Sequence, residues 1–231
     1  EPWLALLGFP LTFGFSFYWG FLNFLIAVPL GLLLVAAAYD HAARPSRGRA
    51  IVLAACAIAA FFGHVLVLGL AGFVSLLILV RRARSAGEAL RLLVPLIVTI
   101  PFVAAWLLAA AQKTSNQVLT VAKWGWVYLR PLELPGLLLG WGFGHGMFAF
   151  GVALLIGLAL AGARFARVRE NGPVFLAGLA VFLLFPAYAL GLAPLYERTA
   201  VFVAAFALPL VDLPRLPLRR WCARILVVAF V

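Results

Sequence analysis

The chain has 231 residues, of which 66% are hydrophobic and only 11% are charged, and its mean hydropathy is +1.14. A soluble globular domain is about 45–50% apolar and about 25% charged, so a single core cannot bury this much apolar surface. The composition excludes a disordered chain, a disulfide-rich secreted domain and, despite the net charge of +11, a nucleic-acid-binding protein. It predicts an integral membrane protein.

The positive charge is concentrated in the polar breaks between apolar runs, where nearly all of the 18 Lys and Arg residues lie. Cytoplasmic loops of membrane proteins collect such residues because a cation is costly to move across the bilayer. We therefore interpret the charge as a signal of topology. Cys56 within an apolar run and Cys222 beside arginines indicate neither a disulfide nor a catalytic thiol.

The first apolar stretch, residues 2–39, is too long for one upright helix, because about 20 helical residues cross a bilayer core. We expect residues 3–13 to form an interfacial or re-entrant piece and residues 17–38 to form the first full span. Arginines at 44, 47 and 49 follow it, which marks that end as cytoplasmic and places Glu1 outside.

The next apolar stretch, residues 51–80, also ends in arginines, at positions 81, 82, 84 and 91. Two cytoplasmic ends require an even number of crossings. The pattern therefore predicts a helical hairpin of about 12 and about 17 residues that turns at the polar break, residues 61–64. One long tilted helix is the alternative.

Residues 89–111 are expected to cross outward, with a bend from Pro95 and Pro101, since proline removes a backbone donor and crowds the preceding turn. The polar segment that follows, residues 112–133, then lies outside. Within it, residues 118–130 mix tryptophans with basic side chains, which is typical of a helix lying in the membrane interface.

The remaining apolar runs predict three more crossings. Residues 134–163 return inward, with an irregular first part up to Gly140 after two prolines, residues 174–192 cross outward, and residues 199–211 return after a tight turn at 194–198. A new run begins at Ile225, only seven residues before the end. The expected fold is one all-α polytopic transmembrane helical bundle over residues 1–231, with some short or broken helices. It has seven crossings and an incomplete eighth, and we expect the chain to be a piece of a longer protein, with its N-terminal part missing.

Polar side chains at membrane depth are costly unless they have partners, so each is a candidate for function. His64, at the predicted hairpin turn, can bind a phosphate or relay a proton near the outer face, or can instead bond a neighbouring helix end. His145 lies among the pairs Gly140/Gly144 and Gly142/Gly146, whose spacing favours close helix packing, with a ligand-facing His145 as the alternative.

Two further groups of candidates lie at predicted span ends. Glu197 and Arg198 are either solvated anchors or face a cavity, where a guanidinium can grip a lipid-linked phosphate with two parallel hydrogen bonds. Tyr18, Trp19 and Asn23 open the first full span, where the amide needs a partner on another helix and favours a structural role.

Some kinds of site are absent from the sequence. No predicted span carries Asp, Glu, Lys or Arg near its centre, which disfavours an ion-coupled transporter. No His, Cys and carboxylate group has metal-ligand spacing, so we expect neither a metal nor a cofactor.

Three segments carry a resemblance to a known family: YWGFLNF, FFGHVLVLGLAG with arginines after it, and LYERTAVFVAAFALPL. They are similar to the later membrane region of large bacterial polytopic proteins of the glycosyltransferase-C superfamily. The resemblance implies transfer of a sugar from a polyprenyl-phosphate carrier at the outer face of the inner membrane. It places the catalytic acid on an early outer loop that nothing here matches, so the catalytic residues are unknown. His64 occupies the position of a basic residue that some members use near the lipid phosphate.

Three hypotheses remain open. A lipid-linked sugar transferase, with membrane lipids and a lipid-linked sugar as its partners, predicts that His64 and Arg198 converge on one outer cavity. A passive or facilitated transporter predicts a polar path that reaches both faces. A structural membrane subunit predicts neither, with Gly140 and Gly144 buried against a partner helix.

Overall fold

The computed structural model describes residues 6, 15–18, 20–114, 127–139, 156–157, 159–160, 162–187, 195–212 and 217–230. Its contacts form two compact units, each described by itself: the α4–α8 unit (residues 22–122 and 189–192) and the α9–α13 unit (residues 1–21, 123–188 and 193–231). The described secondary structure is helical except for one pair of two-residue strands, as the all-α prediction requires. One continuous membrane domain stays a prediction.

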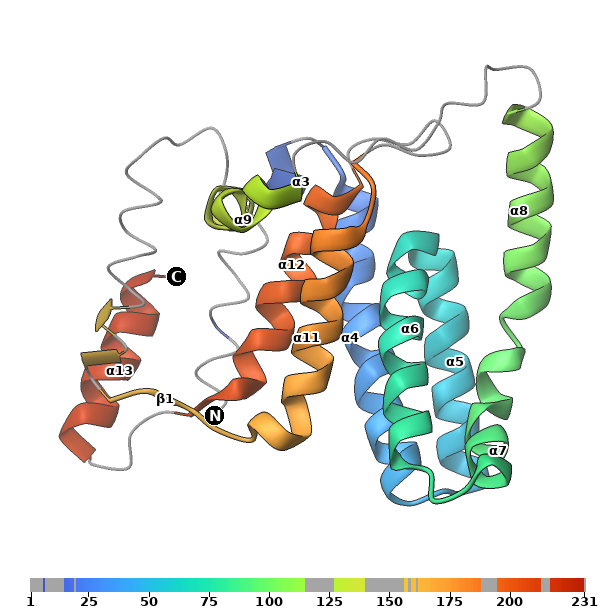
Figure 1. Cartoon of the computed structure of the whole chain (residues 1–231), viewed down its shortest axis with the longest axis horizontal. Coiled ribbons are helices and arrows are strands. Elements are labelled where there is room, and N and C mark those ends of the chain that lie inside the picture. The colour runs from blue at the N-terminus through green and yellow to red at the C-terminus, as the bar shows by residue number, and fades with distance from the viewer. Residues whose placement is uncertain are drawn as a thin grey trace. The chain divides into compact units, whose positions relative to one another are not determined.

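The α4–α8 unit is built on a three-helix layer (Figure 1). Its helices are α4 (Leu22–Ala43), α5 (Arg47–Gly63), α6 (Val65–Arg82), α7 (Ala86–Ile97) and α8 (Ile100–Thr114). Helices α5 and α6 run antiparallel and both pack against α4. The chain breaks between them at His64, whose extended backbone ends α5 and begins α6. The helical hairpin and its turning point are as predicted, although its helices have 17 and 18 residues rather than about 12 and about 17. That both of them cross a membrane stays a prediction.

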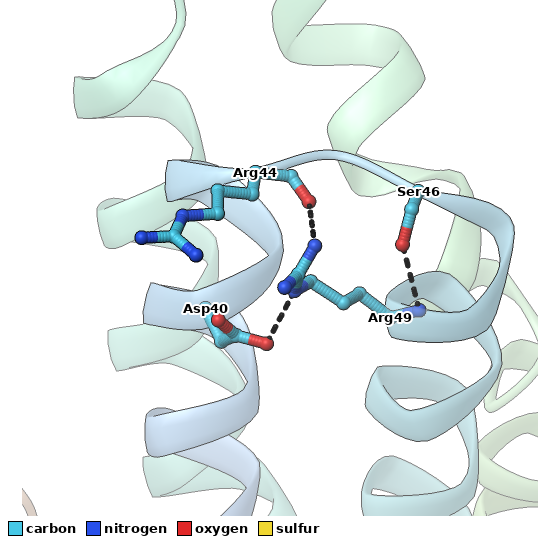
Figure 2. Close-up of polar contacts among 4 residues, drawn as sticks. All are labelled: Asp40, Arg44, Ser46 and Arg49. Carbon is cyan, nitrogen blue, oxygen red and sulfur yellow. Dashed lines mark hydrogen bonds and ion pairs between the residues drawn. The ribbon is translucent and has the colours of Figure 1, made fainter.

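The turn between α4 and α5 shows why α5 begins earlier than predicted (Figure 2). Ser46 is the N-cap of α5, and its hydroxyl accepts a hydrogen bond from the backbone N–H of Arg49 at 3.3 Å. The Arg49 side chain donates to Oδ2 of Asp40 at 2.6 Å and to the carbonyl of Arg44 at 2.9 Å. A serine cap contributes about 1 kcal/mol, whereas a partly exposed ion pair contributes less. The cap therefore starts α5 at Arg47.

The first span begins later than predicted, at Leu22 rather than residue 17. A short helix, α3 (Phe15–Tyr18), precedes it and is followed by a turn at Gly20, whose φ is +72°. The N–H of Gly20 donates to the carbonyl of Phe17 at 2.9 Å, and that of Phe21 to the carbonyl of Ser16 at 2.8 Å. This is the Schellman arrangement, in which a glycine with positive φ ends a helix. The expectation of one helix from residue 17 is therefore wrong.

Both faces of α4 are apolar, although only one of them is covered. Phe24, Ala27 and Leu34 are buried, while Ile26 is 71% exposed and Leu33 is also exposed. The buried face lies close to α5, since a Cβ added to Gly63 would come within 2.9 Å of the Cβ of Ala27. An apolar surface left open along a whole helix fits contact with lipid.

Helices α7 and α8 are bent by 57° relative to each other, as the two prolines predict. The bend lies between them, at Val98 and Thr99, where the hydroxyl of Thr99 donates to the carbonyl of Leu96 at 2.8 Å. Pro101 follows at the second residue of α8 and has no N–H with which to continue the ladder from α7.

Among the described residues, α4 and α6 are each long and apolar enough to cross a membrane, and the bent pair α7 and α8 is a third if it counts as one span. This is the pattern of an integral membrane protein. The number of crossings stays a prediction.

The α9–α13 unit holds shorter elements (Figure 1). Besides α3, they are η1 (Val127–Leu129), α9 (Arg130–Leu139), β1 (Arg164–Phe165), α11 (Val168–Leu184), α12 (Tyr196–Ala207), η3 (Leu208–Leu210), β2 (Val211–Asp212) and α13 (Pro217–Phe230). Helices α11 and α12 pack antiparallel, so closely that a Cβ on Gly178 would meet the Phe206 ring at 2.7 Å. Leu137 of α9, Phe182 of α11, and Ala200 and Val203 of α12 form a buried core.

Two predictions about this unit are wrong. The segment before Gly140 is helical rather than irregular, because Pro131 is the second residue of α9, where a backbone N–H has no partner within the helix. Glu197 and Arg198 belong to the first turn of α12 rather than to a tight turn. The predicted interfacial helix and the glycine pairs lie largely or wholly outside the described residues.

Candidate functional site

The candidate site is a group of five polar side chains in the α9–α13 unit, called here the Arg–Tyr–Glu cluster. Its members are Arg130 and Glu133 of α9 and Tyr196, Glu197 and Arg198 of α12. They lie just before the predicted spans that begin at residues 134 and 199. Helix α12 packs against both α9 and α11, which brings these residues together from positions more than 60 apart in the sequence.

Arg130 is the most deeply buried member, with 1% of its surface exposed. One terminal nitrogen donates to the carbonyls of Phe182, Leu183 and Phe185, at 3.1, 2.6 and 2.6 Å. These carbonyls lie at the C-terminal end of α11, where a helix leaves its last oxygens without internal partners and carries partial negative charge. Arg130 therefore acts as a charged cap that joins α9 to the end of α11.

Tyr196 connects Arg130 to the carboxylates. The Arg130 guanidinium lies 4.0 Å from the centroid of the Tyr196 ring, and the Tyr196 hydroxyl donates to Oε2 of Glu133 at 2.7 Å. Burial, the bond to the Glu133 carboxylate and the charges of Glu197 and Glu133 all raise the pKa of Tyr196, so the hydroxyl stays protonated as a donor. The stacking and the bond together fix the first turn of α12 against α9.

Arg198 lies next to this network and is 8% exposed. Its guanidinium is 3.6 Å from the centroid of the Phe21 ring, a close cation–π contact within the same unit. Burial lowers the pKa of Arg198, and the charge of Glu197 raises it in turn. An arginine keeps its charge in such surroundings, so the cluster holds a positive charge in a poorly solvated place.

Glu197 is the half-buried carboxyl of the cluster. Its Oε2 atom is buried and accepts no hydrogen bond from any residue that the structure describes. Burial raises the pKa of Glu197 to about 7; the negative charge of Glu133 acts in the same direction, while a backbone bond, Arg130 and Tyr196 oppose it. A carboxyl with this pKa can gain or lose a proton near neutral pH, which is the property of a proton-transfer group.

Other candidates from the sequence lie elsewhere. His64 belongs to the α4–α8 unit, where its Nδ1 accepts a hydrogen bond from the N–H of Leu66 at 3.2 Å and its ring meets Phe24 edge-on. It caps α6, which matches the interpretation that it bonds a helix end. Asn23 lies exposed in the first turn of α4. The convergence of His64 with Arg198 stays a prediction.

Three candidates cannot be placed. Trp19 and His145 lie outside the described residues, and Tyr18 ends α3 with a side chain that is not described. Within the described residues, no three His, Cys, Asp or Glu side chains are arranged to hold a metal ion.

Sequence reasoning did not group Arg130 and Glu133 with the residues of α12. Both were assigned to the outer polar segment, where charged residues are ordinary. The signal that could have found them is Arg-Pro-Leu-Glu, a proline at a helix start with a glutamate two residues later. The chain matches no protein-family model, and no curated protein or solved structure is significantly similar to it.

Proposed function

We propose that the chain is a multi-pass protein of the bacterial inner membrane and forms part of a glycosyltransferase-C-like enzyme. This enzyme transfers a sugar from a polyprenyl-phosphate carrier at the outer face. The sequence resemblance and the apolar helices α4 and α6 support the proposal. The Arg–Tyr–Glu cluster lies where the predicted topology has the outer face, and it is the candidate site for the carrier phosphate.

The proposal depends on the position of Arg198. Arg198 is the third residue of α12, in its first turn, so its guanidinium adds to the partial positive charge at that helix end. Its position on the Phe21 ring, with little exposure to water, favours an anion that brings its own apolar chain. A polyprenyl phosphate has this chemistry.

Glu197 supports the same proposal. A negative carboxylate beside Arg198 would repel a phosphate, but a carboxyl whose pKa is about 7 takes up a proton when an anion approaches. The Glu197 carboxyl, whose Oε2 is buried, can then exchange a proton beside the bound phosphate.

The test is a binding measurement on the full chain purified in detergent. Thermal unfolding is followed with undecaprenyl phosphate or with undecaprenol, which has the same apolar chain and no phosphate. We expect the phosphate to stabilise the protein and the alcohol not to do so, with binding weakened about tenfold or more in Arg198→Gln, because a charged hydrogen bond is lost. Arg164→Gln, at an exposed arginine of the same unit, is the matched control. Equal stabilisation by both lipids, or normal binding by Arg198→Gln, contradicts the proposal.

A further inference from the structure

The α4–α8 unit has an end that is rich in arginine, called here the arginine-rich end. Its arginines are Arg44, Arg47, Arg49, Arg81, Arg82, Arg84 and Arg91. The carboxylates in the same stretch of chain, residues 40–91, are only Asp40 and Glu88. The α4–α5 turn and the α6–α7 turn lie at the same end of the unit, so these charges from two separate segments gather there (Figure 1).

The two carboxylates of this end already have partners. Asp40 forms the ion pair with Arg49 at the α4–α5 turn (Figure 2). Oε2 of Glu88 accepts a hydrogen bond from the backbone N–H of Arg84 at 2.7 Å, and its own N–H donates to Ser85 at the start of α7. Meanwhile the side chains of Arg44, Arg47 and Arg84 are exposed. A strong positive field therefore remains at this end.

Helix stability does not explain the position of Arg47. It lies with Arg49 in the first turn of α5, which contains no acidic residue. The partial positive charge of a helix N-terminus disfavours cations there and attracts anions. Arg47 and the first backbone N–H groups of α5 therefore add to the field at the arginine-rich end, at a small cost to the helix.

The position of this end relative to the apolar helices identifies the anion. The two helices that are long and apolar enough to span a membrane, α4 and α6, both end here, at Ala43 and Arg82. Arg82 lies 5.9 Å from the centroid of the Tyr39 ring, and tyrosine is typical of the headgroup level. Charges that directly follow membrane spans lie at the depth of lipid phosphates.

We propose that the arginine-rich end binds the headgroups of anionic phospholipids in the surrounding bilayer. The arginines of the two turns face the lipid phosphates, and selectivity for anionic over zwitterionic lipid comes from the excess of positive charge. This site is separate in sequence and unit from the Arg–Tyr–Glu cluster, so it does not depend on the proposed sugar transfer.

The experiment uses native mass spectrometry of the full chain in detergent, titrated with phosphatidylglycerol, phosphatidylcholine or inorganic phosphate. We expect the wild-type protein to bind phosphatidylglycerol about tenfold or more tightly than phosphatidylcholine. The triple variant Arg44→Gln, Arg47→Gln and Arg84→Gln should lose most of that preference. The same three positions changed to lysine should keep it, which separates the effect of charge from a failure to fold.

Two controls make the result specific. Inorganic phosphate tests whether the site takes a lipid headgroup rather than a free anion, and the lysine variant tests whether positive charge sets the preference. Loss of the preference in the lysine variant, no loss in the glutamine triple variant of the α4–α8 unit, or equally tight binding of inorganic phosphate would overturn the proposal.

Discussion

The buried side chain of Arg130 contacts both the end of α11 and the Tyr196 ring, so its removal should destabilise the protein. Arg130→Ala leaves the carbonyls of Phe182, Leu183 and Phe185 without their donor and uncovers the Tyr196 ring. Removing one partner of such a buried group costs about 3 kcal/mol. We expect Arg130→Ala to lower the melting temperature in detergent by several degrees. Arg164→Ala, at an exposed arginine of β1, should change stability by less than about 0.5 kcal/mol. Equal effects of the two substitutions would contradict the capping role of Arg130.

Glu197 makes the stability of the protein depend on pH. Its pKa in the folded state, about 7, lies above the ordinary value of 4.5, so the folded state binds the proton more tightly than the unfolded state. Its effect on stability is therefore neutral below about pH 4.5, and it becomes destabilising as the pH rises toward 7 and the folded protein resists ionisation. Solvent screening of this half-buried group reduces the change to about 1 kcal/mol.

Glu197→Gln checks this expectation, because glutamine keeps the shape of the protonated carboxyl and cannot ionise. The melting temperature of the wild-type protein, measured from pH 5 to pH 8, should fall more steeply than that of the variant, with the variant more stable at pH 8. Glu170→Gln, at an exposed carboxylate in the first turn of α11, is the matched control. Parallel curves for the wild type and Glu197→Gln would show that burial does not shift this group.

At this scale the sequence predicts isolated charges better than their partners. Glu197 and Arg198 could be singled out because they interrupt an apolar run. Their neighbours could not, because the contacts from Arg130 to α11 cross more than 50 residues. His41 is another polar side chain whose surroundings the sequence does not reveal. It lies buried within α4, and neither ring nitrogen has a hydrogen-bond partner among the described residues.

At the scale of elements, the packing of α11 against α12 depends on Gly178. Alanine is a better helix former than glycine by about 1 kcal/mol, so Gly→Ala at an open helical site is expected to be neutral or stabilising. Gly69 in α6 is such a site, with nothing within 4 Å of an added Cβ. At Gly178 the new methyl group would meet the Phe206 ring at 2.7 Å, and overpacking costs about 1–3 kcal/mol. We therefore expect Gly178→Ala to lower the melting temperature and Gly69→Ala not to do so; the same sign for both would contradict the close approach.

Helix ends could be predicted where flanking charges mark them. They could not be predicted where local hydrogen bonds at the helix end set them. Arginines on both sides of residues 51–80 were enough to predict the hairpin, since topology follows from where cations lie. The start of α4 was missed because the Gly20 turn depends on two backbone hydrogen bonds that hydropathy does not reveal. The helix α9 was missed because two prolines suggest irregular backbone, although the first of them is favourable in an initial helical turn.

At the scale of the whole molecule, the predicted topology places the turns of the α4–α8 unit on different sides of the membrane. The α4–α5 and α6–α7 turns lie at one end of this unit, and the His64 turn lies at the other (Figure 1). Across a bilayer, the first two turns must then face the same compartment and the third the opposite one. The positive charge of the first two turns predicts that this compartment is the cytoplasm.

Cysteine labelling tests this arrangement. Single cysteines are introduced as Pro45→Cys, Ala86→Cys or Phe62→Cys, all at exposed positions, after the native cysteines have been changed to alanine. A membrane-impermeant maleimide should reach position 62 in intact cells and positions 45 and 86 only in inverted vesicles. Labelling of 45 and 86 from opposite sides would show that α5 and α6 do not cross as a pair. It would also remove the common face on which the arginine-rich end meets lipid, because the two turns would then lie in separate leaflets.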